Sequence, residues 1–182
     1  MTTFANHVMG TIQPVKEMRK IMDESGHDIA LFVDAGHAYG RIAIDVREYG
    51  IDLMSVSAHK IHGPQGVGAL YVRNGIQISS TKHGINRIDA LETGCISIPA
   101  IAGFAKAVQL QFSDLQAHIA KIISLRERLY KGIKENIPHI LLNGPEGDKR
   151  IAHNLNVSFD YIEGEAIMMM LDVHSITVAT GS

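Results

Sequence analysis

The chain has 182 residues, and its content of 46% hydrophobic and 20% charged residues is typical of a globular protein that buries a core, in one large domain or one and a half small ones. A formal net charge of −2 without a basic run, and 5% aromatic residues without tryptophan, argue against nucleic acid as a partner. One cysteine excludes an internal disulfide, the apolar stretches are too short or too interrupted to span a membrane, and the N-terminus lacks a signal-peptide pattern, so we expect a cytoplasmic protein.

The first half of the chain combines one helix with several strands. Pro14 opens a helix with an apolar face, and Gly26 ends it. The run IALFVDA is almost continuously apolar, which is typical of a strand covered on both faces in a parallel sheet. Residues 41–50 form a short amphipathic or irregular segment. Two further strands, LMSVSAH and VGALYVR, are joined by a turn rich in glycine and proline.

The second half begins with a long helical pattern. Apolar residues recur at helical spacing over residues 98–137, which is too long for an average helix, so we expect a break near residues 111–115 and an end at Pro138. There follow strands in HILLNGPEG and AHNLNVSFDYI, a helix in GEAIMMMLDVH and a last strand in ITVAT. This order predicts an α/β fold with a mainly parallel sheet in residues 1–110, and a linker helix with a partial small α/β domain in residues 111–182.

Two charged residues follow the predicted buried strands. Asp34 ends one strand, and ligands of open α/β sheets bind beyond the carboxyl ends of strands. The alternative is a loop carboxylate that accepts backbone hydrogen bonds, and the motif alone leaves both open. Lys60 follows the next strand, where a desolvated lysine can lose its proton and attack a carbonyl carbon. The alternative, a surface lysine in a turn, is more common for a lysine taken alone.

Asp34 and Lys60 together are more specific than either residue. Pyridoxal phosphate needs a lysine for its aldehyde, an acid for its pyridine nitrogen, and hydroxyl and N–H groups for its phosphate. Ser57 and His59 flank Lys60 at a spacing that lets both reach the rim of such a pocket. His37 follows Asp34 closely enough to bond a ring oxygen or to stack nearby. These residues predict a pyridoxal phosphate site.

The run VDAGHAYGRIAIDVREYGIDLMSVSAHKIHGPQGVGALYVR resembles the cofactor-lysine region of the cysteine desulfurases, fold-type I pyridoxal phosphate enzymes related to class V aminotransferases. GTIQPVKEM resembles the segment before it, and LNVSFDYIEGEAIMMMLD with the final TGS resembles the small domain of that family. The resemblance implies that Lys60 forms the Schiff base, that Asp34 pairs with the pyridine nitrogen, and that Ser57 and His59 contact the phosphate. It also implies that His37 replaces a glutamine that is hydrogen-bonded to the ring oxygen. A histidine can donate the same hydrogen bond, but only in one tautomer.

The chain departs from this family in length and at several positions. The family's chains are about twice as long. The resemblance therefore implies that residues 1–110 correspond to the C-terminal half of the large cofactor domain. The other half of that domain supplies the family's phosphate-binding threonine and ring-stacking histidine. His7 replaces an asparagine that touches the cofactor, and Glu92 replaces an arginine, which inverts the local charge. Cys95 replaces a threonine that reaches the partner subunit's phosphate. The family's catalytic cysteine would follow Ser182, so we expect Cys95 to be a small buried residue.

Three functions follow from these observations. The first is a pyridoxal phosphate-dependent cysteine desulfurase, which converts L-cysteine to L-alanine and holds the sulfur as a persulfide for iron–sulfur cluster or thio-cofactor assembly; Lys60 would also transfer protons. The second is a non-catalytic, shortened relative with a structural or partner-binding role, and the third is a lyase or transaminase. We expect L-cysteine or a similar amino acid, a homodimer or complementing chain, and a sulfur-acceptor scaffold protein as partners. No metal ion is expected, because His59 and His62 lack further ligands at a recognised spacing.

Overall fold

The computed structural model describes residues 1–79 and 97–180, together with the backbone of two short strands at 86–88 and 92–93. The chain divides into two compact units. The first comprises Met1–Phe4 and Pro14–Leu115, and the second comprises Ala5–Gln13 and Gln116–Ser182. The side chain of Glu92 and the whole of Cys95 lie outside the described residues. The interpretation of residues 1–110 and 111–182 as parts of a large and a small domain stays a prediction.

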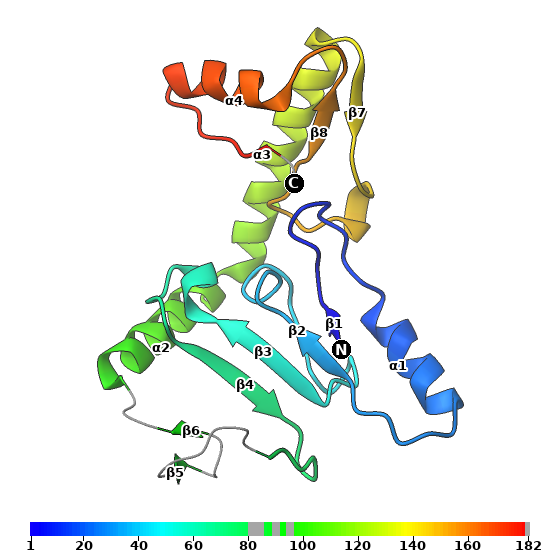
Figure 1. The fold of residues 1–182 in the computed structure, drawn as a ribbon, viewed down its shortest axis with the longest axis vertical. Coiled ribbons are helices and arrows are strands. Elements are labelled where there is room, and N and C mark those ends of the chain that lie inside the picture. The colour runs from blue at the N-terminus through cyan, green and yellow to red at the C-terminus, as the bar shows by residue number, and fades with distance from the viewer. Residues whose placement is uncertain (80–85, 89–91, 94–96, 181–182) are drawn as a thin grey trace. The chain divides into compact units, whose positions relative to one another are not determined.

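A four-stranded sheet lies at the centre of the first unit, with its strands in chain order (Figure 1). The three strands β1, β2 and β3 are parallel to one another, and β4 is antiparallel to β3. Their bounds are Thr2–Thr3, Phe32–Asp34, Leu53–Ser57 and Gly68–Val72. The predicted α/β fold is therefore confirmed, with a sheet that is mixed and mainly parallel.

The two faces of β2 and β3 differ in burial. Val33, Met54 and Val56 alternate onto one face and are buried. The opposite face carries Asp34, which is exposed, and Ser55, which is half-buried. The predicted strand in IALFVDA is thus not covered on both faces within the described residues, because Phe32 and Leu53 on the second face are only half-buried and Asp34 at the carboxyl end of β2 is exposed.

The helices of the first unit agree with the predicted pattern. Helix α1 spans Val15–Glu24 and follows Pro14, although only Val15 is buried among its residues. Helix α2 spans Ile98–Phe112, and the hydroxyl of Ser97 accepts a hydrogen bond from the N–H of Ala100 at its start. A break follows within the predicted range. There Ser113 donates its hydroxyl hydrogen to the carbonyl oxygen of Leu110, a local bond that competes with continuation of the helix.

The second unit contains a long helix, a hairpin and a shorter helix. Helix α3 spans Leu115–Asn136, with its first residue in the first unit. Strands β7 and β8 pair antiparallel, and helix α4 follows them. The bounds are Ile140–Leu142 for β7, Val157–Phe159 for β8 and Gly164–Val173 for α4, with a short 3-10 helix η2 at Gly147–Lys149.

One predicted strand is absent, and two short strands were not predicted. The predicted strand in ITVAT is wrong, since residues 176–180 pair with no described strand. Its β-branched residues have the propensity of a strand, but a strand also needs a partner edge. The short strands β5, Asn86–Ile88, and β6, Glu92–Thr93, form a separate antiparallel pair.

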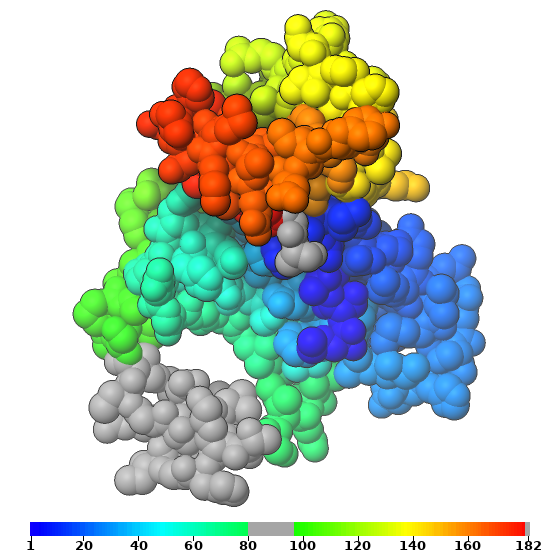
Figure 2. All heavy atoms as spheres, turned by 45° about the horizontal axis from the view of Figure 1, so that its top comes forward, coloured from blue at the N-terminus to red at the C-terminus, as the bar shows by residue number. Residues whose placement is uncertain are grey.

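Helix α4 lies at the surface of the second unit, as the orange and red spheres of Figure 2 show. Met169, Met170 and Val173 are exposed on it. Among the described helices, none is both long enough and apolar enough to cross a membrane.

Candidate functional site

Asp34 lies at the carboxyl end of β2, in register with Ser55 of the neighbouring strand β3. The hydroxyl of Ser55 donates to Oδ1 of Asp34 at 3.3 Å, and the backbone N–H of Gly36 donates to the same oxygen at 2.9 Å. These two bonds fix the carboxylate from one side. Oδ2 has no hydrogen-bond partner among the residues that the structure describes, so it can accept a donor from a ligand. Asp34 therefore accepts a backbone hydrogen bond from Gly36, as the loop alternative predicts, and its Oδ2 at the end of β2 can also accept a donor from a ligand.

Lys60 lies just past the end of β3, in a single 3-10 turn, η1, that spans Ala58–Ile61. The N–H of Ala58 donates to the carbonyl of Val67 at 3.1 Å, and the N–H of Gly63 donates to the carbonyl of Ala58 at 2.9 Å. Ala58 and Ile61 are buried, whereas Lys60 is half-buried. Within the described part of the chain the Lys60 ammonium makes no hydrogen bond or ion pair, so it is available to react.

The turn that carries Lys60 is held by close packing behind it. The side-chain amide of Gln111 in α2 donates to the carbonyl of Gly40 at 2.6 Å. Gly40 has a φ of +72°, and a Cβ there would lie 2.8 Å from Cγ2 of Ile61 and 2.7 Å from Cγ of Gln111. Only glycine fits this position without strain. Ile61 therefore packs closely against Gly40, beside Gln111 of α2, and this packing fixes the turn that carries Lys60.

The sequence-predicted residues divide between the two units. Five of them lie in the first unit, in or directly after β2 and β3; these are Asp34, His37, Ser57, His59 and Lys60. A Cβ built on Gly36 would lie 3.2 Å from Oδ1 of Asp34 and 4.0 Å from Oγ of Ser57, so both oxygens border one small space. His37 is half-buried in the turn after β2, and His59 is exposed. His7 belongs to the second unit and is exposed there.

The sequence interpretation missed Ser55. Its hydroxyl orients the carboxylate of Asp34 across the strand pair. Ser55 precedes Ser57 by two residues and therefore lies on the same face of β3. That spacing was the signal from which its role could have been predicted.

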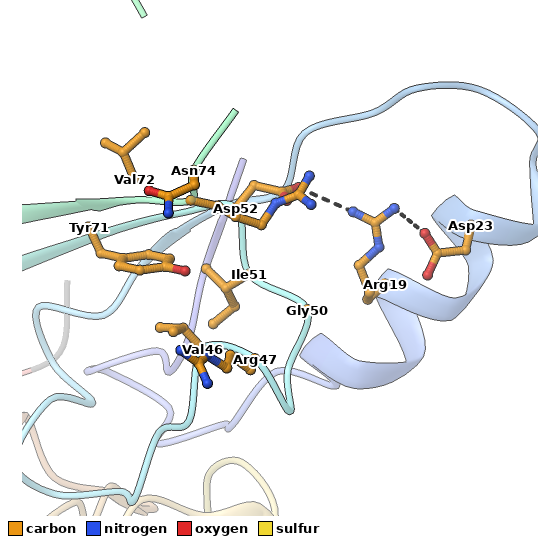
Figure 3. A pocket seen from close by; sticks show the side chains of 11 residues that line it. Arg19, Asp23, Val46, Arg47, Gly50, Ile51, Asp52, Tyr71, Val72 and Asn74 are labelled. Carbon is orange, nitrogen blue, oxygen red and sulfur yellow. Dashed lines mark hydrogen bonds and ion pairs between the residues drawn. The ribbon is translucent and has the colours of Figure 1, made fainter. Parts of the chain in front are cut away.

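A larger hollow in the first unit lies at the opposite end of β3 (Figure 3). It has a volume of about 780 Å³ and contains Asp52, which precedes β3 and is 2% exposed. Asp52 pairs with Arg73 at 2.6 Å and with Arg19 at 3.2 Å, and it accepts the N–H of Leu31 at 2.7 Å. Both carboxylate oxygens are thus used: Oδ2 joins Arg19 of α1 to the N–H of Leu31, and Oδ1 pairs with Arg73, which follows β4. The groove holds a structural ion-pair network, away from Lys60.

No group of three or more histidine, cysteine, aspartate or glutamate side chains is arranged to hold a metal ion within the described residues. The candidate site therefore consists of the polar ends of β2 and β3 and the turn η1.

The complete chain, residues 1–182, matches the family model described as Aminotransferase class-V. The chain belongs to the class V aminotransferase family. Cysteine desulfurase IscS of Dictyoglomus turgidum is 39% identical over 178 residues, which are 98% of this chain and 44% of that protein. IscS of Methanosarcina thermophila is 40% identical over 179 residues, which are 98% of this chain and 43% of that protein.

Solved structures of this family show the same fold. The NifS-like protein from Rickettsia africae matches with a TM-score of 0.91 and 27% identity, over 100% of this chain and 49% of that one. DndA from Streptomyces lividans matches with a TM-score of 0.80 and 29% identity, over 94% of this chain and 49% of that one. The predicted resemblance to cysteine desulfurases is confirmed, and the chain spans about half the length of the relatives it matches.

Class V aminotransferases and cysteine desulfurases depend on pyridoxal phosphate. The donor and acceptor set at the ends of β2 and β3 fits this cofactor. Asp34 offers one open carboxylate oxygen, Lys60 offers an unpaired amine among the described residues, and Ser57 offers a hydroxyl beside Asp34. An acid, a lysine and a hydroxyl are the groups that the pyridine nitrogen, the aldehyde and the phosphate require.

Proposed function

We propose that this chain is part of a cysteine desulfurase that depends on pyridoxal phosphate. The reaction breaks the carbon–sulfur bond of L-cysteine and forms a sulfur–sulfur bond with a protein thiol. The carbon gains a hydrogen, so L-cysteine and the thiol give L-alanine and a persulfide. The observation that carries the proposal is the open oxygen of Asp34 beside the strand that leads to Lys60, in a chain whose relatives are named cysteine desulfurases.

Each residue of the candidate site has a role in this proposal. Bound pyridoxal phosphate supplies an electron sink for the bonds around the amino acid's α-carbon. Asp34 holds a proton on the pyridine nitrogen, and Lys60 binds the aldehyde and carries protons to and from the substrate. Ser57 and His59 bind the phosphate, while His37 donates to the ring oxygen.

The proposal includes further groups. His7 stands where the resemblance implies an asparagine, and we propose it as a cofactor contact on that ground alone. The thiol that accepts sulfur lies outside residues 1–182 or on another chain, and the remaining cofactor contacts come from a homodimeric partner or a complementing chain. A scaffold protein for iron–sulfur cluster assembly in the cytoplasm then receives the sulfur.

Lys60→Ala provides the main test. When pyridoxal phosphate is added to the purified chain, we expect a visible absorbance band, and borohydride is expected to fix the pyridoxyl group on Lys60, which peptide mass spectrometry detects. Lys60→Ala is expected to lose both signals, because the primary amine is the group that binds the aldehyde. Lys106→Ala serves as the control, since the one hydrogen bond of the Lys106 ammonium to a described residue goes to Gln109 on the surface of α2.

Two outcomes would contradict the cofactor assignment. One is a band of equal strength in Lys60→Ala, and the other is a labelled lysine elsewhere with Lys60 unlabelled. The absence of any band in the wild-type chain would favour a non-catalytic role. Formation of alanine from cysteine in the presence of a thiol acceptor then tests the reaction itself.

Ser55→Ala tests the orientation of Asp34. We expect the Kd for pyridoxal phosphate to rise roughly 2- to 12-fold, the value of one ordinary hydrogen bond, because Oδ1 of Asp34 keeps only its bond from Gly36. Titration of the visible band measures this Kd. Ser124→Ala is the control, since Ser124 is exposed on α3. An unchanged Kd in Ser55→Ala would mean that the Ser55 hydroxyl does not position Asp34 for the cofactor.

A further inference from the structure

The dipeptide Asn-Gly occurs twice in the sequence, at Asn74–Gly75 and at Asn143–Gly144. An asparagine is chemically labile when the backbone nitrogen of the next residue can attack its side-chain carbonyl carbon. Glycine hinders this attack least, because it has no side chain and lets the backbone approach closely. The sequence therefore makes the two sites equivalent, and only their surroundings in the fold can distinguish them.

The first site lies on an exposed turn that follows β4. Asn74 and Gly75 are both exposed, and the turn is closed by a hydrogen bond from the N–H of Ile76 to the carbonyl of Arg73 at 3.1 Å. The side-chain amide of Asn74 and the N–H of Gly75 make no hydrogen bond to a described residue. Gly75 has a φ of +95°, and a Cβ built on it would meet nothing within 4 Å. The amide of Asn74 can therefore turn toward the nitrogen of Gly75 without breaking a hydrogen bond to the described part of the chain.

The second site holds the same dipeptide in place. Asn143 is half-buried, and its side-chain nitrogen donates to Oδ1 of Asn156 at 3.0 Å and to the hydroxyl of Ser158 at 2.7 Å. Gly144 has a φ of +85°, and a Cβ there would lie 2.2 Å from the carbonyl oxygen of Met9, so its backbone is closely packed. Attack by the nitrogen of Gly144 on the side chain of Asn143 would first have to break both side-chain hydrogen bonds.

We propose that Asn74 is a site of spontaneous deamidation and that Asn143 is protected from the same reaction. The nitrogen of Gly75 loses its proton and forms a bond to Cγ of Asn74. The bond from Cγ to the amide nitrogen breaks, and this nitrogen takes up a proton and leaves as ammonia. Water then opens the resulting succinimide ring at one of its two carbonyls and gives aspartate or isoaspartate. The reaction therefore needs only water and a base, with no oxidant or reductant.

The modification changes the charge of the groove drawn in Figure 3, because Asn74 is among the residues that line it. The charged residues of this groove are three arginines and two aspartates, namely Arg19, Arg47, Arg73, Asp23 and Asp52. One positive charge is thus in excess, and the carboxylate that forms at position 74 cancels it. The proposal is independent of the cofactor assignment, since the groove lies at the end of β3 opposite to Lys60.

The test compares the two sites within one chain. The purified chain is incubated in mildly alkaline buffer prepared with heavy-oxygen water, and it is then digested in ordinary water for peptide mass spectrometry. We expect the peptide that contains Asn74 to take up the oxygen label and to appear mainly as isoaspartate. We expect Asn143 to react about tenfold more slowly, or more slowly still, because two hydrogen bonds hold its amide. In urea the two rates should become similar, since only the local sequence then acts.

Two variants complete the experiment. Asn74→Gln is expected to remove the label from this peptide, because glutamine would have to close a larger ring. In Ser158→Ala the amide of Asn143 keeps only its bond to Asn156, so Asn143 should react roughly 2- to 12-fold faster while Asn74 is unaffected.

Three results would contradict the proposal. In the folded chain, Asn143 could react as fast as Asn74, or Asn74 could stay unmodified although it reacts in urea; either result would overturn the assignment of Asn74. An unchanged rate at Asn143 in Ser158→Ala would overturn its protection by side-chain hydrogen bonds. The label separates deamidation of the folded chain from deamidation during digestion, because only the incubation contains heavy oxygen.

Discussion

Replacing Asp52 with alanine is expected to lower the free energy of unfolding of the first unit by about 3–5 kcal/mol, the usual cost of breaking a buried ion pair. The carboxylate is buried and has three partners, namely Arg19, Arg73 and the N–H of Leu31. Its removal leaves the Leu31 N–H unsatisfied and deprives α1 of its ionic link to the sheet. Because Figure 3 shows Arg19 between Asp52 and Asp23, a neighbouring acid offers a direct comparison.

Asp23→Ala is that comparison. Asp23 pairs with the same Arg19, but its carboxylate is exposed and the pair is screened by solvent. Hydrogen bonding from Arg19 lowers the pKa of Asp23 below its ordinary value, yet the exposed pair should contribute little. Urea unfolding, followed by hydrogen exchange in β2 and β3, measures both variants. Equal shifts in the two variants would show that burial of Asp52 is not what makes its ion pairs matter.

Replacing Arg150 with methionine is expected to destabilise the second unit by about 2–4 kcal/mol. The guanidinium donates to the carbonyl of Pro145 at 2.6 Å, to the amide oxygen of Asn154 at 2.6 Å and to the carbonyl of Asn143. Arg150 is buried, so its charge is partly desolvated, and this burial together with the nearby Arg126 lowers the pKa of Arg150. Methionine avoids this desolvation cost, but it leaves three acceptors without a donor.

Arg128→Met is the matched control, because Arg128 is exposed on α3 and makes no ion pair with any described residue. We expect its effect on stability to be about 0.5 kcal/mol or less. Hydrogen exchange in β8 reports on the second unit separately from the first. A change in Arg150→Met no larger than in Arg128→Met would mean that water or a rearranged loop satisfies the three acceptors.

Local sequence patterns were sufficient to predict most of the helices and strands. Pro14 marked the start of α1, and the excessive length of the pattern over residues 98–137 predicted the break that the structure has at Ser113. These signals depend on residues close to one another in the sequence. The failed strand in ITVAT shows the limit of the approach, because propensity is a local property whereas a strand needs a partner edge.

The residues of the candidate site were likewise predictable only where the signal was local in the sequence. Asp34 and Lys60 were identified by their positions after apolar runs, and the structure places both at the carboxyl ends of neighbouring strands. The spacing of Ser55 from Ser57 places it on the same face of β3, but its bond to Asp34 depends also on the register between two strands. Long-range side-chain bonds could not be predicted either: the amide nitrogen of Asn154 donates to the carbonyl of His7, although the two residues are 147 positions apart and no periodic pattern connects them.

That separation has a consequence for how the protein is made. During synthesis the loop at residues 5–13 leaves the ribosome long before residues 149–156, which supply hydrogen-bond partners for it. Until those residues emerge, the carbonyls of His7 and Val8 can bond only to water or to transient neighbours. Contacts between distant parts of a sequence form slowly, because the chain must close a long loop before any bond is gained. The loop at residues 5–13 is therefore expected to reach its final structure late in folding, after the strands β2 and β3 have already paired.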